Sequence, residues 1–257
     1  MNMTKSVFFF LLMCWLTLPV SLLAQAQTLL RVASPEFPPY VYKLENGEVG
    51  GVVSEIVAEV FQNMGVDYKN TIYPWARALR MLKVGQTDSL YTIMKSKDRE
   101  ALFHYPDEHL LDAQWVFFIR RADVGKLKFD SFEDLKGKRI GLVIDVRYSE
   151  ALWEFVKKEN NYELVVGEEL NFKKLVAGRV DYIISDYLTG MFLAKKRGIE
   201  NSVAALTANP IDSTHFYIAF NQLNVERTFV KLFSDELNKF KSGARYKQIL
   251  QKYNIPQ

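Results

Sequence analysis

Stretches with the pattern of buried strands alternate along most of the chain with stretches of helical pattern. In the first half, apolar or alternating positions predict strands at 29–34, 66–73, 89–93 and 114–120. Amphipathic spacing predicts helices at 54–64 and 75–84. Gly65 and Gly85 follow these helices, as expected of glycines that end a helix.

The second half continues the same alternation. Strands are predicted at 139–144, 162–166, 181–185, 203–206 and 214–221. Helices are predicted at 132–135, 149–158, 171–177, 188–196, 225–241 and 246–253. Because alternating strands and helices build mostly parallel sheets, we expect an α/β fold with binding sites beyond the carboxyl ends of the strands.

One junction occurs twice. A helix, a glycine, two further residues and an aspartate precede a strand at Gly85–Asp88 and again at Gly178–Asp181. Such junctions are common in α/β chains, so chance recurrence is one interpretation. The other interpretation is two α/β lobes of similar design.

The first 26 residues have the pattern of a secretory signal peptide. Lys5 precedes an apolar run at 7–23, and Ala24-Gln25-Ala26 forms a small-x-small cleavage site. An uncleaved membrane anchor is the alternative, because the run approaches the length of a membrane span. No later run is as long and apolar, so we expect the mature protein to lie outside the cytoplasm, in the periplasm.

Composition and charge exclude several classes of protein. Thirty-three basic and 30 acidic residues are too balanced to indicate binding to nucleic acid or an anionic membrane. The single cysteine, Cys14, falls in the predicted signal peptide, so we expect no disulfide and no thiolate chemistry. His104, His109 and His215 lack metal-ligand spacing, and no nucleophile elbow, phosphate loop or dinucleotide motif occurs. We therefore expect no metal, no cofactor and no enzymatic activity.

Aromatic residues cluster at strand-to-helix junctions. Phe37 and Tyr40 flank two prolines after the first strand, and Trp75 follows Pro74. Each could pack in the core, but their shared position favours an aromatic lining for a ligand.

Charged residues occupy comparable loops. Arg99 could grip a carboxylate, with the Thr92 hydroxyl nearby in sequence, or could be a solvated surface arginine. Asp186 ends an apolar strand, where it could accept an ammonium group or cap the next helix. Arg77 and Arg147 are two further cations close to these loops.

Taken in order, these motifs resemble those of bacterial extracellular solute-binding proteins of family 3, the polar-amino-acid type. The shared segments are the aromatic–Pro–Pro–aromatic loop at 37–40, the tryptophan-to-aspartate segment at 75–88, the loop leading to arginine at 92–99, and the segment ending in aspartate at 178–186.

The resemblance implies the two-lobed periplasmic binding protein type II fold. Each lobe would be a mostly parallel sheet flanked by helices, with a two-strand hinge and the ligand between the lobes. Residues 27–117 and 216–257 would form lobe 1, and residues 118–215 would form lobe 2.

It also implies roles for single residues. Phe37 and Trp75 match ligand-facing aromatics, Arg99 matches the arginine that binds an α-carboxylate, and Asp186 matches the aspartate that binds an α-ammonium group. The loop Asp145-Val146-Arg147 departs from the family's small hydroxyl-bearing loop. Since Arg77 and Arg147 would suit a second anionic group, a dicarboxylic amino acid or another small anion is also consistent with the sequence.

The expected function is capture of an amino acid or related carboxylate by a monomer that serves an inner-membrane ABC transporter. One alternative is a dehydratase-like enzyme on the same fold, with Asp145 or Glu55 as its acid. Another is a ligand-binding sensory module that acts through a membrane receptor.

Overall fold

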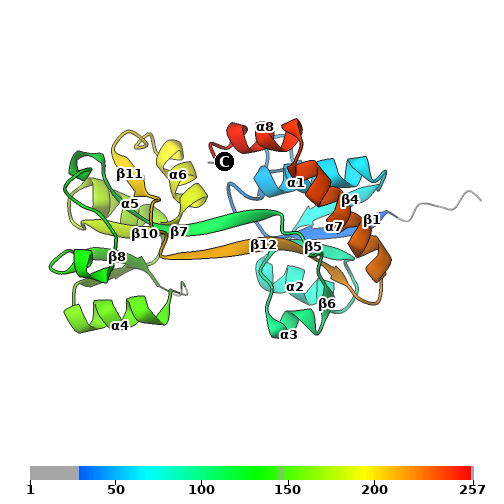
Figure 1. Ribbon diagram of the computed structural model, residues 1–257, viewed down its shortest axis with the longest axis horizontal. Coiled ribbons are helices and arrows are strands. Elements are labelled where there is room, and N and C mark those ends of the chain that lie inside the picture. The colour runs from blue at the N-terminus through cyan, green and yellow to red at the C-terminus, as the bar shows by residue number, and fades with distance from the viewer. Residues whose placement is uncertain (1–28, 145, 147, 256–257) are drawn as a thin grey trace, which may run out of the picture.

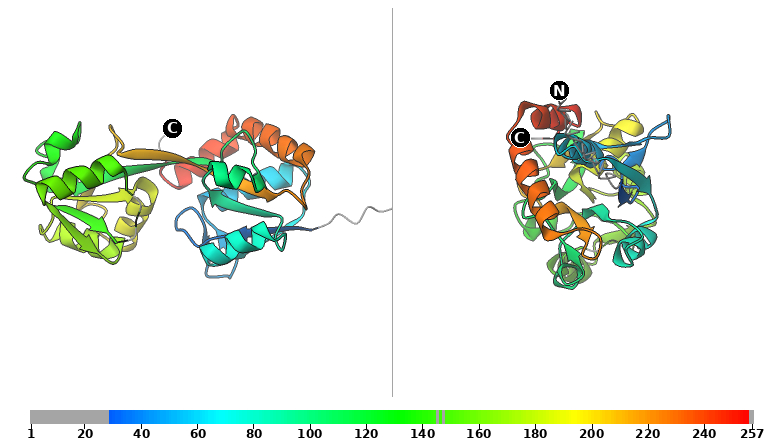
Figure 2. Two further views of the ribbon diagram at one scale, coloured as in Figure 1. Left: turned by 90° about the horizontal axis from the view of Figure 1, so that it is seen from below. Right: turned by 90° about the vertical axis from the view of Figure 1, so that its right-hand side faces the viewer.

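The computed structural model describes residues 29–144, 146 and 148–255, so the predicted signal peptide lies outside the described part. Two lobes lie side by side, and two long strands, β7 and β12, run between them (Figure 1). The left view of Figure 2 shows the same elongated arrangement, and the right view looks along its long axis. No helix among the described residues is long and apolar enough to cross a membrane.

The elements of lobe 1 come from both ends of the chain. They are β1 (Leu30–Ser34), β2 (Tyr42–Lys43), β3 (Val49–Gly50), α1 (Val52–Asn63), β4 (Tyr68–Ile72), α2 (Trp75–Lys83), β5 (Ser89–Ile93), α3 (Lys97–Glu100), β6 (Phe103–His104), α7 (Arg227–Lys241) and α8 (Ala244–Lys252). The linking strands are β7 (Leu111–Arg120) and β12 (Asp212–Asn221).

The elements of lobe 2 are continuous in sequence. After the short 3₁₀ helix η1 (Arg121–Asp123) they are η2 (Phe132–Leu135), β8 (Ile140–Val143), α4 (Glu150–Glu159), β9 (Tyr162–Val165), α5 (Glu168–Val176), β10 (Tyr182–Asp186), α6 (Tyr187–Lys196) and β11 (Val203–Leu206). The fold is therefore the predicted two-lobed α/β architecture, while the exact lobe boundaries at 117/118 and 215/216 stay a prediction.

One sheet path passes through both lobes in the order β4-β1-β5-β12-β7-β10-β8-β9. The pairs β1–β4, β1–β5, β8–β9 and β8–β10 are parallel, as expected from the alternation of strands and helices. Both linking strands change partners midway. β12 pairs with β7 over 212–216 and with β5 from Tyr217 onwards, and β7 then continues beside β10 and β11.

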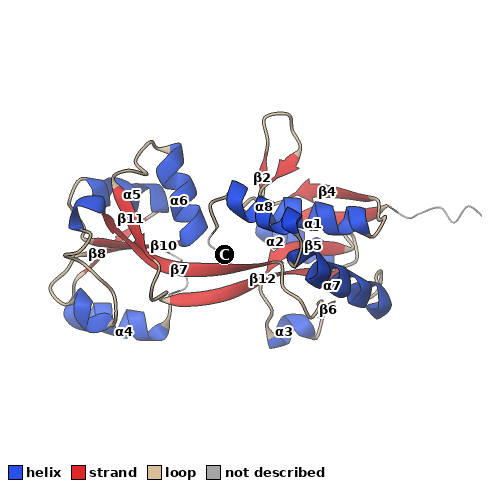
Figure 3. Cartoon of the chain, turned by 45° about the horizontal axis from the view of Figure 1, so that its top comes forward, coloured by secondary structure: helices blue, strands red, loops and turns tan. Residues whose placement is uncertain are grey.

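Alternating side chains give each sheet two apolar faces. In lobe 1, Val32 packs with α1, α7 and α8, whereas its neighbour Ala33 packs against α2 on the other face. In lobe 2, Phe117 faces α4, whereas Phe118 faces α5 and α6. Figure 3 shows helices covering both sides of the strands in each lobe. Each lobe thus has its own core.

The repeated junction has the same bonding in both lobes. Asp88 accepts hydrogen bonds from the backbone and guanidinium of Arg31, which also donates to the Gly85 carbonyl. Asp181 accepts the equivalent bonds from Arg139, which donates to the Gly178 carbonyl. Both arginines lie near the amino ends of their strands. The recurrence is therefore structural, and it ties strand starts together at the edge opposite the predicted binding edge.

Most predicted elements are confirmed, some with other bounds: β7 begins at Leu111 instead of 114. The predicted turn at 95–98 overlaps the helix α3. The sequence does not predict this helix, because its four residues are all polar and lack an amphipathic pattern. Helix α5 begins at Glu168 instead of 171, because two glutamates in its first turn suit a helix amino terminus. The short hairpin β2–β3 was not predicted from the sequence.

Candidate functional site

The carboxyl ends of the parallel strands bear several of the predicted site residues. Ser34 ends β1, and the aromatic loop 37–40 follows it, with a cis peptide bond between Pro38 and Pro39. Gly51 lets this loop lie against α1: its φ is +111°, and a Cβ there would meet the Tyr40 carbonyl oxygen at 2.4 Å. In lobe 2, Asp186 ends β10.

Trp75 and Arg99 lie together on lobe 1. Trp75 begins α2 and is 37% exposed, and the Arg99 Cζ lies 5.3 Å from the centre of its ring. Arg99 Nη1 donates to the Met94 carbonyl at 2.9 Å. Within the described part of the chain Arg99 forms no ion pair. A guanidinium held over an indole with no carboxylate partner is suited to binding an anion.

The side chains of two other predicted residues contact residues close to them in sequence. Arg77 is exposed, and its Cζ lies 4.9 Å from the centre of the Tyr73 ring. Thr92 is buried at a φ of +60°, and its hydroxyl donates to the Tyr91 carbonyl at 2.5 Å. Arg147, like Asp145, lies outside the described residues.

Tyr40 connects the two lobes. Its ring is fully buried, stacked on Phe37 at 5.0 Å and edge-on to Phe216 at 4.9 Å between ring centres. Its hydroxyl donates to the Asp186 carboxylate, with both oxygens 2.8 Å away. The core-packing interpretation of Tyr40 is therefore observed, and a ligand-lining role for Phe37 and Tyr40 stays a prediction.

Asp186 is a buried carboxylate at the edge of lobe 2. It is 2% exposed, and its Oδ1 accepts the Thr189 backbone N–H at 2.9 Å, so the helix-cap interpretation is observed. Burial raises the pKa of Asp186, although the bonds from Thr189 and Tyr40 oppose that shift. No lysine, arginine or histidine among the described residues pairs with it. The ammonium-binding role stays a prediction. Such a role requires a carboxylate that has no cation partner within the protein.

Glu168 is a second carboxylate here, and the sequence analysis missed it. Its Oε2 accepts the Ser185 hydroxyl at 2.7 Å. Burial and then the nearby Asp186 charge raise the pKa of Glu168 to about 7, against the Ser185 bond. Its position at a strand-to-helix junction, three residues beyond β9, is the signal that could have found it, because Asp186 was found at the junction between β10 and α6.

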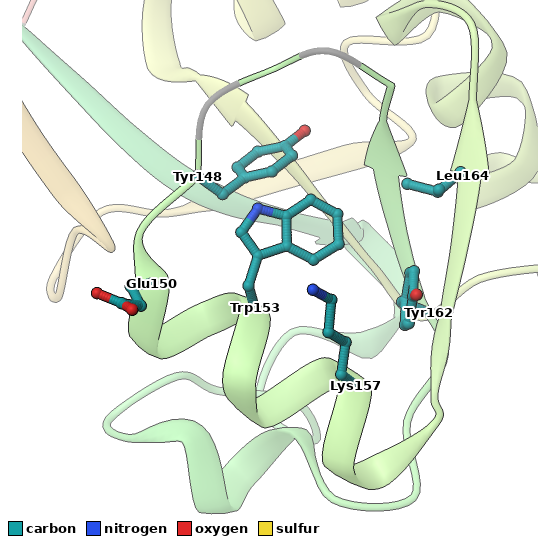
Figure 4. Close-up of a pocket in the computed structure, with 6 residues that line it drawn as sticks. All are labelled: Tyr148, Glu150, Trp153, Lys157, Tyr162 and Leu164. Carbon is teal, nitrogen blue, oxygen red and sulfur yellow. The ribbon is translucent and has the colours of Figure 1, made fainter.

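Two hollows lie on lobe 2. One, of about 530 Å³, is lined by Val166, Gly167, Glu168, Glu169, Leu170, Lys173, Thr189 and Leu193. The other, of about 600 Å³, lies between α4 and β9 and contains none of the predicted site residues (Figure 4). In it the Lys157 ammonium lies 5.3 Å from the centre of the Trp153 ring. We take the first as part of the candidate site, since it reaches Glu168 and the capped turn of α6.

Comparison with known proteins indicates one protein family. The model of bacterial extracellular solute-binding proteins, family 3, matches residues 30–256. The L-cystine-binding protein TcyJ of Escherichia coli K12 is 20% identical over 229 residues, which cover 88% of this chain and 82% of that protein.

Solved structures share the fold. The substrate-binding domain 2 of Lactococcus lactis GlnP, in an open conformation, has a TM-score of 0.74 at 17% identity, covering 88% of this chain and 94% of that one. A histidine kinase sensor domain similar to periplasmic binding proteins has a TM-score of 0.63 at 21% identity, covering 89% and 97%.

Proposed function

Because the chain belongs to family 3 of the bacterial extracellular solute-binding proteins, we propose that it captures an amino acid or a related small carboxylate in the periplasm for an ABC importer. The observation that carries this proposal is the division of unpaired charge between the lobes. Lobe 1 offers the Arg99 guanidinium over Trp75, and lobe 2 offers the buried Asp186 carboxylate, which pairs with no cation among residues 29–144, 146 and 148–255.

These two groups have the chemistry that an α-amino acid needs. A guanidinium binds the α-carboxylate through two parallel hydrogen bonds, and a buried carboxylate accepts the α-ammonium group. A ligand that carries both charges would compensate Arg99 and Asp186 at once. Closure of the lobes about β7 and β12 would bring them to the same molecule and shield it from water.

The ligand class follows from the additional acid. Glu168 places a second carboxyl group beside Asp186, next to the hollow of about 530 Å³. An amino acid with a second amino group or a long polar side chain therefore fits lobe 2 better than a dicarboxylic one. The similarity to an L-cystine-binding protein supports the inclusion of L-cystine among the ligands to test.

A ligand panel tests the proposal. Thermal unfolding and calorimetric titration of the protein with each common amino acid, L-cystine and simple dicarboxylates should identify a stabilising ligand. At a concentration of 100 Kd such a ligand adds about 2.7 kcal/mol to the free energy of unfolding. Absence of stabilisation by every member of the panel contradicts the proposal.

A sensory role is the second candidate, and the similarity to a histidine kinase sensor domain favours it. In both cases the protein binds its ligand, so binding alone does not separate them. Ligand-dependent stimulation of the ATPase of a reconstituted importer supports transport, and its absence with an otherwise functional importer supports the sensory role.

Turnover by the protein is less well supported. Glu55, one of the acids considered for it, accepts hydrogen bonds from Lys252 at 2.7 Å and from the Tyr253 hydroxyl at 2.5 Å, so it is engaged at the carboxyl end of the chain. Mass spectrometry of each binding ligand after prolonged incubation checks this point, because a binding protein returns its ligand unchanged.

A further inference from the structure

Three side chains with metal-binding chemistry gather on the strands that link the lobes. Asp112 on β7 and His215 on β12 are direct cross-strand partners in the antiparallel register. His109 comes from the segment just before β7. Residues 103 positions apart in sequence are thus neighbours, because such partners have Cβ atoms about 5 Å apart.

Their potential ligand atoms point to a common place. The Asp112 Oδ1 lies 3.1 Å from the His109 Nε2 and 2.5 Å from the His215 Nδ1, and one ligand atom from each residue lies within 4.8 Å of the other two. The two imidazole rings lie 4.5 Å apart between centres and are tilted by 41° to each other. The side chains of His109, Asp112 and His215 are 25%, 59% and 55% exposed, so an ion can reach them from solvent.

We propose that His109, Asp112 and His215 bind one divalent transition-metal ion of the Zn²⁺ type, with water in the fourth position. Two imidazoles and one carboxylate are ligands that Zn²⁺ accepts, at about 2.0–2.2 Å from the metal. A tetrahedral arrangement at that radius separates ligand atoms by about 3.3 Å. The separation between His109 and Asp112 already fits, and the separation between His215 and Asp112 must lengthen by about 1 Å.

One neighbouring cation, the Lys241 ammonium, lowers the affinity of the proposed site for a metal ion. The Lys241 ammonium lies 3.4 Å from the His109 Nε2 and is bonded to the Glu108 carboxylate and the His109 carbonyl. The positive charge of Lys241 repels a cation bound to His109.

The proposed metal site is separate from the solute site. Side chains alternate along β7 and β12, so Leu111, Ala113 and Phe216 face the apolar core that holds Tyr40. Asp112 and His215 project from the opposite face of the same two strands. A failure of the proposed solute binding therefore leaves the metal proposal standing, and the reverse also holds.

Direct metal titration tests the proposal. Untagged protein, freed of metal by a chelator, is titrated with Zn²⁺ against a chromophoric chelator and with Co²⁺ by visible absorption. We expect one equivalent of Zn²⁺ and a tetrahedral Co²⁺ spectrum. Uptake of less than one equivalent at micromolar concentrations overturns the proposal.

Variants separate this site from non-specific binding. His215→Ala and His109→Ala should each weaken Zn²⁺ binding by at least about tenfold. His104→Ala is the matched control, because His104 pairs with Phe220 further along β12 and should leave binding unchanged. Lys241→Met should tighten binding, since it removes the opposing charge. Wild-type affinity in His215→Ala, or weaker binding in Lys241→Met, contradicts the proposal.

Discussion

At the scale of single residues, several charged side chains of the candidate site have no ion-pair partner among the described residues. Among the described residues, Asp186 receives hydrogen bonds only from hydroxyls and backbone N–H groups, and Glu168 only from a hydroxyl. A buried carboxylate without a cation is costly, so such groups occur where a ligand supplies the missing charge. On lobe 1 the half-buried Arg99 guanidinium contacts the Trp75 ring and the Met94 carbonyl, and it forms no ion pair within the described part of the chain.

Replacement of Arg99 by alanine tests its role directly. If the guanidinium makes two charged hydrogen bonds to the ligand, Arg99→Ala should weaken binding of the ligand found in the panel by about 100-fold or more, because each such bond contributes about 1.5–3 kcal/mol. Calorimetric titration measures the change. Arg179→Ala removes another exposed arginine and should leave affinity unchanged. Unaltered affinity in Arg99→Ala removes it from the site.

Glu168 predicts a pH dependence of stability. Because its pKa is about 7 when folded and lies near 4.5 when unfolded, the folded state holds the proton more tightly. The resulting stability is present below pH 4.5 and is lost as the pH rises through 7, by about 3 kcal/mol at most. Urea unfolding should therefore show that Glu168→Gln is more stable than wild type at pH 8 and similar at pH 4.5.

The control for this prediction is another glutamate in the same lobe. Glu163 is exposed and pairs with Lys174, so Glu163→Gln should change stability little and equally at both pH values. The stability of the wild type relative to Glu168→Gln should fall between pH 4.5 and pH 8. If it does not fall, the raised pKa of Glu168 is contradicted.

At the scale of elements, the repeated Gly-x-x-Asp junction serves structure, not binding. Asp88 and Asp181 each fasten an arginine at the amino end of a strand, away from the candidate site. Burial alone would raise the pKa of each aspartate, but the bonds from Arg31 and Arg139 outweigh it and lower the pKa. These pairs stabilise the fold above the unfolded pKa and lose that effect as the pH falls through the lowered one.

The two junctions should contribute equally and independently. Asp88→Asn and Asp181→Asn should each lower the free energy of unfolding by about 1.5–3 kcal/mol, because each leaves an arginine without its charged partner. The double variant should equal the sum within about 0.5 kcal/mol, since the sites lie in different lobes. Urea titration measures stability, and ligand affinity is the control that should not change.

The sequence predicts elements better than it predicts contacts. Strong patterns located β5 and β11 residue for residue, whereas the all-polar α3 carried no pattern to detect. For the site, position beyond a strand end identified Asp186, but its bond to Tyr40 joins residues 146 positions apart. Similarly, no spacing rule relates Asp112 to His215. Such contacts depend on strand register and lobe packing, which local sequence does not encode.

At the scale of the whole molecule, the lobes are joined by two strands, and among the described residues segment 38–42 of lobe 1 also contacts Asp186 and α6 of lobe 2. Tyr40 reaches Asp186, and Leu188 of lobe 2 packs into the core of lobe 1. Each lobe otherwise has its own apolar core, so the lobes can move as rigid bodies about β7 and β12 (Figure 1). This arrangement suits a binding protein that closes on its ligand.

Solution scattering tests this motion. We expect the radius of gyration to fall on addition of the ligand that stabilises the protein, because the lobes approach one another around it. Arg99→Ala with the same ligand concentration is the control and should keep the unliganded radius. An unchanged radius for the saturated wild type excludes a closing motion.

The place of β12 in the sheet also sets the order in which the protein can fold. β12 lies between β5 and β7, yet it follows every element of lobe 2 in the chain. As the chain emerges from its amino end, lobe 2 is complete while the fully buried strand β5 still presents an unpaired apolar edge. Lobe 1 therefore depends on contacts of long sequence separation, which form slowly. We expect the nascent chain to be most prone to aggregation in the interval before β12 and α7 are made.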